Sequence, residues 1–263
     1  MTDKVTRQTD ARGVATLTLN RRDIHNAFDD DVVNGLSTEL DRIHADNNVR
    51  VLIITGAGKS FSAGADLNWM RAMTQYDKAR NQADAVKLAE MMAKLNELNK
   101  PTIARINGPT FGGGVGLVTC CDIAVAADNA KFALTEVKLG LVPAVISPYV
   151  IEAIGVRNAR RFFLSAEIMN APAALSTGLV HQVVKPHELD EAVDSQVELL
   201  LQAGPEALKQ CKQLIRDVTA NSLMDHASLR QMTADLIARL RISEEGQEGL
   251  SAFLEKRPPN WKK

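Results

Sequence analysis

Apolar residues in the first part of the chain alternate between strand-like and helix-like spacing. Val14–Leu19 is a β-branched and apolar run that ends in polar residues, and apolar residues recur at helical intervals from Asp29 to His44. A short apolar run without polar alternation follows at Val51–Thr55, which is typical of a strand covered on both faces. The pattern therefore predicts a parallel sheet with helices packed outside it.

The same alternation continues through the middle of the chain. A helical pattern from Ala79 to Leu98 is broken by Pro101, and strands are predicted at Thr102–Ile106 and Ile123–Ala127. Strands separated by helices indicate an α/β core built from repeated crossover connections.

The last part of the chain has an almost entirely helical pattern. Helices are predicted at residues 189–202, 205–220 and 223–240. We therefore divide the chain into an α/β core over residues 1–190 and a helical region over residues 191–263. We expect the helical region to pack on the core or on a neighbouring subunit.

Composition and charge are those of an ordinary globular protein. The 263 residues are 45% hydrophobic and 24% charged, and 31 Lys and Arg against 32 Asp and Glu give a formal net charge of -1. A near-neutral chain has no extended field for a polyanion, so we expect no nucleic-acid partner. The sequence shows no disulfide framework, metal-ligand spacing, signal peptide or long apolar run, so we expect a cytoplasmic protein without metal or membrane association.

Two glycine-rich segments resemble nucleotide-binding loops but lack the required spacing. Residues 58–60 read Gly-Lys-Ser, yet a Walker A loop needs glycine where Ile53 stands. A dinucleotide fingerprint that begins at Gly112 needs glycine where Leu117 stands. Neither nucleotide-binding motif is therefore present.

The small-residue loops at 62–66 and 111–114 suggest another use of these glycines. Each loop follows a strand and leads toward a helix, where backbone N–H groups are free and the helix dipole is positive. Two such N–H groups that converge on one oxygen form an oxyanion hole. Tight turns and close helix packing are the alternative explanation of the same glycines.

Four segments, in order, resemble the signatures of the crotonase, or enoyl-CoA hydratase/isomerase, superfamily. They are Ser60–Leu67, Pro101–Gly108, the stretch from Gly112 to Ala124, and Phe132–Gly140. The resemblance extends over nearly the whole chain. It implies an α/β fold of the crotonase type, a ClpP-like spiral of repeated ββα units followed by a helical carboxyl-terminal region.

Three segments narrow the resemblance within the superfamily. Leu67–Met70, Phe111–Gly116 and Leu141–Tyr149 most resemble bacterial hydratases of methylglutaconyl-CoA in leucine degradation, or the related carboxygeranoyl-CoA hydratases. This likeness implies a lyase that adds water to an α,β-unsaturated acyl-CoA. It also implies no cofactor beyond the coenzyme A of the thioester substrate.

The resemblance assigns catalytic roles to a few positions. The backbone N–H groups of Ala65 and Gly113 are expected to hold the thioester carbonyl and stabilise an enolate. Glu136 is expected to be the acid–base carboxylate, with a pKa raised by its apolar neighbours, although a solvated charge beside Lys138 is the alternative reading. Family hydratases carry a second glutamate where this chain has Gly116, so we expect an empty space there.

Because position 116 is a glycine and not a second glutamate, the type of reaction is not fixed by the resemblance. Glu136 can act alone in hydration, it can act alone as the proton shuttle of a Δ3,Δ2-enoyl-CoA isomerase, or the same enolate can serve another reaction. A non-catalytic homologue that binds RNA or acyl-CoA is a further alternative, which the near-neutral charge disfavours. We expect hydration, because the segments that resemble the hydratase subgroup include Gly116.

The resemblance also assigns binding residues and an assembly. The acyl pocket is expected to be lined by Trp69, Met70, Phe111, Leu139, Val142 and Ile146. Coenzyme A is expected beside Arg22, Asp23, His25, Ala63, Asp66 and Leu67, with Phe253 and Lys256 of a neighbouring subunit closing over it. Relatives are trimers or dimers of trimers, so we expect a homotrimer or hexamer with the helical region at its interfaces.

Overall fold

The structure is a computed structural model that describes residues 3–220 and 225–262. The chain forms two compact units, one made of the residues up to 98 together with 102–194, and one made of 99–101 together with the residues from 195 onward. Both sheets belong to the first unit, whereas the second unit is helical. Among the described helices, none combines the length and apolar character needed to cross a bilayer.

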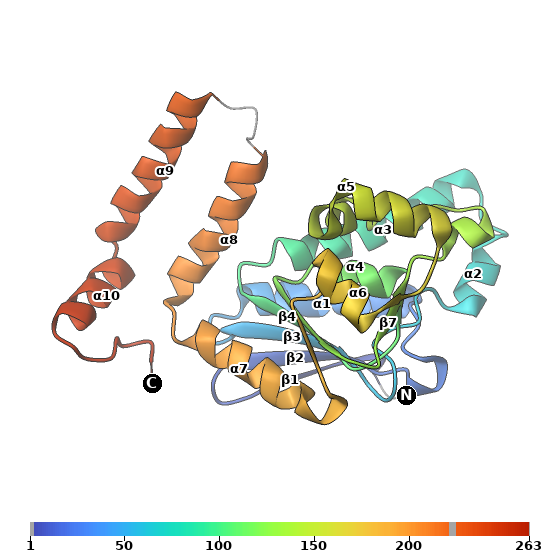
Figure 1. The fold of residues 1–263 in the computed structure, drawn as a ribbon, viewed down its shortest axis with the longest axis horizontal. Helices are drawn as coiled ribbons and strands as arrows, with labels where there is room; N and C mark the ends of the chain where they lie inside the picture. The colour runs from blue at the N-terminus through green and yellow to red at the C-terminus, as the bar shows by residue number, and fades with distance from the viewer. Residues whose placement is uncertain (1–2, 221–224, 263) are drawn as a thin grey trace. The chain divides into compact units, whose positions relative to one another are not determined.

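A six-stranded sheet is the centre of the first unit (Figure 1). Its order is β1-β2-β3-β4-β6-β9, with β1 antiparallel to β2 and every other neighbouring pair parallel. The strands are β1 Val5–Thr9, β2 Val14–Leu19, β3 Val51–Gly56, β4 Thr102–Ile106, β6 Ile123–Ala127 and β9 Gln182–Val184. The register pairs Leu17 with Ile54 and Ile54 with Ala104, so three fully buried residues form one row across the sheet.

A second, three-stranded sheet joins segments that contribute to the site. β5 is parallel to β7, and β7 is antiparallel to β8. These strands are β5 Thr110–Phe111, β7 Lys131–Ala133 and β8 Met169–Asn170. The pairing of β5 with β7 brings the glycines after Phe111 close to the segment that contains Glu136.

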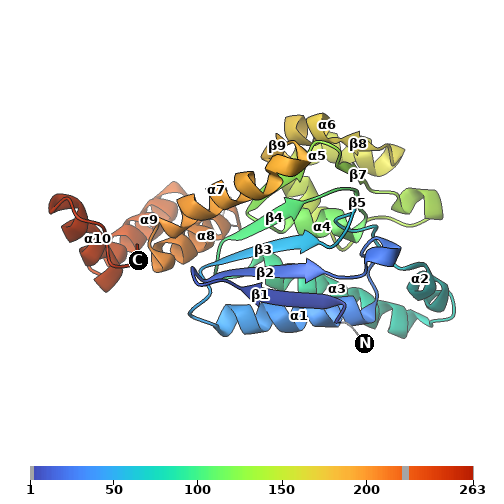
Figure 2. The ribbon, with the colours of Figure 1, turned by 90° about the horizontal axis from the view of Figure 1, so that it is seen from below.

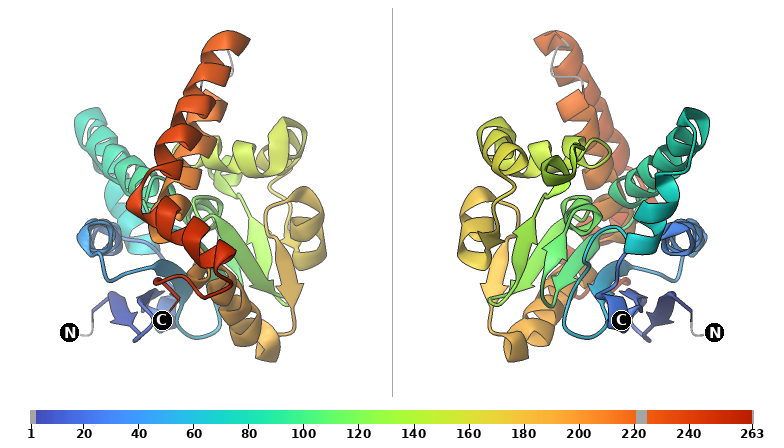
Figure 3. Two further views of the ribbon diagram at one scale, coloured as in Figure 1. Left: turned by 90° about the vertical axis from the view of Figure 1, so that its left-hand side faces the viewer. Right: turned by 90° about the vertical axis from the view of Figure 1, so that its right-hand side faces the viewer.

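Helices cover the sheets of the first unit and make up most of the second. The α-helices are α1 Asp30–Ala45, α2 Leu67–Met73, α3 Lys78–Asn96, α4 Gly113–Thr119, α5 Ser147–Ser165, α6 Ala171–Thr177, α7 Leu189–Leu201, α8 Pro205–Ala220, α9 His226–Arg241 and α10 Glu244–Leu254. The 3-10 helices are η1 Arg22–Ile24, η2 Glu136–Leu139 and η3 Pro186–Glu188. α1 lies along β1 and β2 with α3 beside it (Figure 2), and α4 lies between α3 on one side and α5 on the other (Figure 3).

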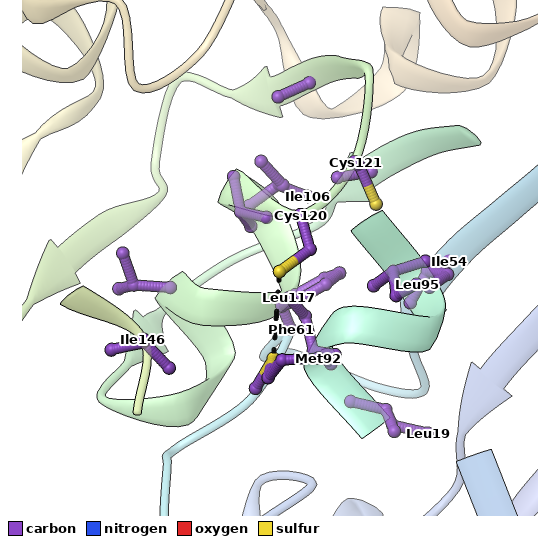
Figure 4. Packing of buried hydrophobic residues seen from close by; sticks show 14 of the residues in the cluster. Leu19, Ile54, Phe61, Met92, Leu95, Ile106, Leu117, Cys120, Cys121 and Ile146 are labelled. Atoms are coloured by element: carbon purple, nitrogen blue, oxygen red, sulfur yellow. Dashed lines mark hydrogen bonds between the residues drawn. The ribbon is translucent and has the colours of Figure 1, made fainter. Parts of the chain in front are cut away.

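The core of the first unit is made where α3 and α4 meet the sheet (Figure 4). Ile54 and Ile106 of the sheet, Met92 of α3, and Leu117 and Cys120 of α4 are buried in one cluster. The Cys120 thiol donates to the Met92 sulfur at 4.0 Å. Burial raises the pKa of this thiol, so Cys120 is an apolar packing residue rather than a nucleophile.

The structure confirms the α/β class and most of the predicted elements. The strands at 14–19, 102–106 and 123–127 have the predicted bounds, and the helix that begins after Asp29 is capped by that side chain, which accepts from the Val32 N–H. The helix predicted from Ala79 to Leu98 is α3, one residue earlier and two residues shorter at its end. The helix predicted at 223–240 is α9, and residues 223 and 224 lie outside the described residues.

Some elements are not marked by the sequence pattern. β1 has the sequence Val-Thr-Arg-Gln-Thr, and this polar strand exists because it pairs with β2 at the edge of the sheet. α10 begins where Ser243 accepts from the Gly246 N–H, a cap that the apolar spacing alone does not reveal.

Candidate active site

A large apolar cavity lies in the first unit, with a volume of about 770 Å³. Its walls come from α2, α3, η2, the segment that follows η2, and the two small-residue loops. The predicted residues that line it are Ala63, Ala65, Leu67, Trp69, Met70, Phe111, Gly113, Glu136, Leu139, Val142 and Ile146. The structure therefore brings together segments that are far apart in the sequence.

The loop before α2 leaves the Ala65 N–H free. The Phe28 N–H donates to the Gly64 carbonyl at 2.7 Å, and the Asp66 N–H donates to the Phe28 carbonyl at 2.7 Å. This parallel bridge binds the residues on both sides of Ala65, so the N–H of Ala65 itself points away from Phe28. Within the described part of the chain it has no hydrogen-bond acceptor, and Ala65 lines the cavity.

A second free donor lies at the start of α4. Gly112 precedes the helix with φ 48° and ψ -119°, a conformation open to glycine, and its N–H donates to the Ala133 carbonyl at 3.0 Å. The N–H of Gly113 belongs to the first turn of α4 and has no acceptor within the helix. A Cβ on Gly64 would lie 3.1 Å from the Phe111 carbonyl oxygen, so the two loops are in direct contact.

Glu136 supplies the charge of the cavity. Among the described lining residues it is the single ionisable one, and it begins η2. Its Oε2 atom is buried and has no hydrogen-bond partner within the described residues. Burial raises the pKa of the Glu136 carboxyl, because the charged form loses solvation. This environment supports the acid–base role over a solvated charge beside Lys138.

Replacement of Gly112 by alanine is expected to affect both stability and catalysis. Its backbone conformation is strained for any L residue, at a cost of about 1–3 kcal/mol. The new Cβ would also lie 3.3 Å from Glu136 Oε1 and crowd the carboxylate. We expect a lower free energy of unfolding, measured with urea, and a lower kcat.

Gly155→Ala is the matched control for this prediction. Gly155 also has a positive φ, of 73°, but a Cβ there meets no atom within 4 Å, and the residue does not line the cavity. This variant should lose stability and keep kcat. A Gly112→Ala enzyme with normal kcat would show that the glycine serves the backbone alone.

The space beside Gly116 is filled, so the expectation of an empty space there is wrong. A Cβ on Gly116 would lie 2.3 Å from Ile146 Cγ2 and 3.1 Å from Met92 Cε. Ile146 directly precedes α5, is 3% exposed and lines the cavity; it and Met92 are both drawn in Figure 4. An apolar side chain therefore takes the place of the second carboxylate, and Gly116 itself does not line the cavity.

Asp66 lies beside the cavity but serves the local structure. Its carboxylate caps α2 by accepting from the N–H groups of Asn68 at 2.7 Å and Trp69 at 3.3 Å, and it also pairs with Arg21. Burial acts to raise the pKa of Asp66, but these hydrogen bonds outweigh it and the pKa is lowered. The Asp66 side chain does not line the cavity.

Of the residues assigned to coenzyme A by resemblance, Ala63 and Leu67 line the cavity, whereas the others lie outside its lining. Arg22 and Asp23 belong to η1 and are exposed, and His25 Nδ1 lies 2.9 Å from Ser60 Oγ. Phe253, in α10 of the second unit, is 80% exposed, and Lys256 follows that helix. Their roles toward coenzyme A stay predictions.

The cavity also contains residues that the sequence does not single out. They include Phe28, Met73, Ala85, Leu88, Thr135 and Val145. Ala85 and Leu88 lie one turn apart on α3, but helical spacing cannot distinguish a cavity wall from a core face. Over residues 3–220 and 225–262 there is no group of three His, Cys, Asp or Glu side chains placed to hold a metal ion.

The arrangement suits chemistry at the carbon next to a carbonyl group. Two free N–H donors and a carboxylate with a raised pKa share one apolar cavity. Donors of this kind stabilise an oxyanion, and a carboxylate of this kind accepts and returns a proton. The site therefore has the parts of an enzyme that forms an enolate.

Comparison with known proteins identifies the family. The model of the enoyl-CoA hydratase/isomerase family matches residues 9–263. The chain is 35% identical to a 2,3-dehydroadipyl-CoA hydratase of Escherichia coli (strain K12) over 95% of both chains, and 33% identical to a crotonyl-CoA hydratase of Syntrophomonas wolfei over 94% of both. The crystal structure of an enoyl-CoA hydratase from Shewanella pealeana has a TM-score of 0.94 and 42% identity, covering 98% of this chain and 96% of that one. The chain belongs to the enoyl-CoA hydratase/isomerase family and has its α/β fold, as expected.

Proposed function

We propose that the protein hydrates an α,β-unsaturated acyl-CoA, with Glu136 as its single acid–base group. The observation that carries the proposal is the pair of free N–H groups, on Ala65 and Gly113, that share a cavity with one carboxylate whose Oε2 atom is buried. The two donors hold the thioester oxygen as it gains charge, and each such donor contributes about 3 kcal/mol in the transition state.

One carboxylate suffices for the proton transfers of hydration. The water oxygen bonds to C3 of the enoyl group while Glu136 takes a proton from that water, and the electron pair of the double bond moves to the thioester oxygen as an enolate. The enolate collapses, C2 takes the proton from Glu136, and the carboxylate is restored. Both new bonds form on the face of the substrate that Glu136 occupies, because no second carboxylate is found among the described lining residues.

Isomerisation of a 3-enoyl-CoA is the second candidate, and Ile146 favours it. This reaction needs no water, since Glu136 removes a proton from C2 to give a dienolate, held by the same two N–H groups, and returns the proton to C4. Ile146 occupies the place beside Gly116 from which a second carboxylate would hold the water. The two candidates therefore differ in whether a water molecule enters beside Glu136.

Methylglutaconyl-CoA, from leucine degradation, is the substrate that the sequence resemblance suggests. Its acyl chain carries a carboxylate, and none of the described lining residues is Lys, Arg or His. An unpaired carboxylate is costly to move from water into apolar surroundings. The cavity therefore gives more support to a neutral acyl chain, and methylglutaconyl-CoA becomes a test substrate rather than the expected one.

The test is to incubate the purified protein separately with crotonyl-CoA, methylglutaconyl-CoA and a 3-enoyl-CoA, following absorbance of the conjugated thioester. We expect conjugation to be lost from crotonyl-CoA as water adds. Conjugation gained from the 3-enoyl-CoA without any hydration would replace hydration by isomerisation. If no substrate is turned over, the protein only binds its ligand.

The oligomeric state is a separate expectation. The homotrimer or hexamer stays a prediction of the family resemblance.

A further inference from the structure

Arg21 contacts three parts of the structure around Ala65 without lining the cavity. Its Nη1 donates to the Ala27 carbonyl at 2.7 Å, and its Nη2 lies 2.9 Å from Asp66 Oδ2 and 3.0 Å from Asp29 Oδ2. The side chain is 16% exposed, so these contacts are largely shielded from water. The resemblance to the family assigns no role to this residue.

Two of these contacts lead directly to the backbone that holds Ala65. Asp66 follows Ala65 in the chain and caps α2. Ala27 precedes Phe28, whose N–H and carbonyl bind the residues on either side of Ala65. Arg21 therefore joins both sides of the parallel bridge that directs the Ala65 N–H.

The negative charges of Asp29 and Asp66 make these contacts depend on the cation of Arg21. The side chains of Asp29 and Asp66 are 17% and 9% exposed, and both carboxylates contact the same guanidinium nitrogen. Lys4 also reaches Asp29, at 2.7 Å, whereas Arg21 is the one cation that contacts Asp66 among the described ion pairs. Without Arg21 a buried carboxylate next to Ala65 would keep its backbone bonds but lose its counter-charge, a costly state.

We propose that Arg21 is a positioning residue that holds the Ala65 N–H toward the thioester oxygen. The inference rests on the proposed oxyanion site, because Arg21 acts through Ala65 and not on the substrate. The planar guanidinium presents several N–H groups in fixed directions, which lets it bind two carboxylates and a carbonyl at once. A lysine ammonium provides the charge without this geometry.

Binding of acetoacetyl-CoA tests the proposal. This thioester ionises to an enolate that absorbs in the near ultraviolet, so the enolate fraction and the total bound thioester can be measured separately. In Arg21→Met we expect the bound enolate fraction to fall about tenfold, since one oxyanion donor is misaligned, while total affinity changes less than about threefold. Arg21→Lys should recover part of the enolate signal.

A second variant keeps the proposal testable if Arg21→Met does not fold. Asp66→Asn retains a side-chain oxygen that can cap α2, but it loses the negative charge that pairs with Arg21 next to Ala65 and leaves Asp29 as the remaining charged partner. It should also lower the enolate fraction more than the total affinity. Folded Asp66→Asn protein with a normal enolate fraction would overturn the proposal.

Arg7→Met is the matched control. Arg7 Nη2 lies 2.8 Å from Asp46 Oδ2 and joins β1 to the end of α1, away from the cavity lining. This variant should lose stability and keep the enolate fraction. If Arg21→Met behaves like Arg7→Met, Arg21 is structural and the proposal is wrong. If the unaltered protein binds the thioester but gives no enolate signal, the oxyanion site itself is wrong and the proposed function fails with it.

Discussion

Replacement of Glu136 by glutamine is expected to lower kcat by about 10³-fold with little change in KM. The amide keeps the shape and polarity of the side chain but cannot take a proton. No other ionisable residue is found among the described residues that line the cavity, so none can replace it. The measurement is the initial rate of hydration of crotonyl-CoA by the variant and the unaltered enzyme.

The pH dependence of kcat should report the pKa of Glu136. Burial raises the pKa of Glu136, so the acid limb of the pH profile should lie above the ordinary glutamate range. Activity should fall as pH decreases through this raised pKa, because the reaction starts from the carboxylate. An acid limb at the ordinary pKa of a solvated glutamate would contradict a buried catalytic base.

Glu136→Gln should at the same time raise the melting temperature at neutral pH. A carboxyl whose pKa is higher in the folded state stabilises the fold below its unfolded pKa and loses this contribution as pH rises through the folded pKa. At neutral pH the charged, buried group therefore destabilises the fold, and the neutral amide removes that cost. The gain should vanish in acid, where the carboxyl is protonated in both states.

Lys138→Gln is the control for the Glu136 variant. Lys138 lies in the same 3-10 helix and is exposed, outside the cavity lining. Its replacement should leave kcat, the acid limb and the melting temperature nearly unchanged. A Glu136→Gln enzyme that keeps full activity would remove the single-carboxylate mechanism from both hydration and isomerisation.

Replacement of Gly116 by glutamate is expected to lower the free energy of unfolding by about 3 kcal/mol or more. Even the first carbon of the new side chain would lie 2.3 Å from Ile146 Cγ2, and the carboxylate would enter apolar surroundings. Gly116 and Ile146 are both buried, so the contact is relieved only if Ile146 leaves its packed position. Urea unfolding followed by circular dichroism measures the loss.

The Ile146→Ala variant makes this prediction specific. Alone it should destabilise by about 2–5 kcal/mol, because it leaves a cavity. Combined with Gly116→Glu, it vacates the space that the new side chain needs, so the double variant should be about 1–3 kcal/mol more stable than the sum of the single effects.

Val142→Ala is the comparison for this double variant. Val142 is 68% exposed and is not among the atoms nearest to a Cβ on Gly116. Its effect should add to that of Gly116→Glu within about 0.5 kcal/mol. If the effects of Gly116→Glu and Ile146→Ala on the free energy of unfolding add in the same way, Ile146 is not the residue that excludes a side chain at position 116.

Local patterns in the sequence determined the strands and the two small-residue loops, and the family resemblance named the donors within those loops. The β-branched and apolar segments Val14–Leu19 and Thr102–Ile106 are strands with the predicted bounds, because such side chains pack well on the surface of a sheet. Small residues before two helices located the loops of Ala65 and Gly113. Apolar neighbours of Glu136 correctly indicated a raised pKa.

The tertiary structure alone decided what surrounds these residues. Gly116 suggested an empty space, but Ile146, which directly precedes α5, fills it. Arg21 was one residue of a polar loop in the sequence, whereas the fold places it on Asp66, 45 positions away. Periodicity reports which face of an element is buried, but it does not report which distant side chain packs there. That depends on how the elements pack, and here it places Ile146 beside Gly116 and in the lining of the cavity.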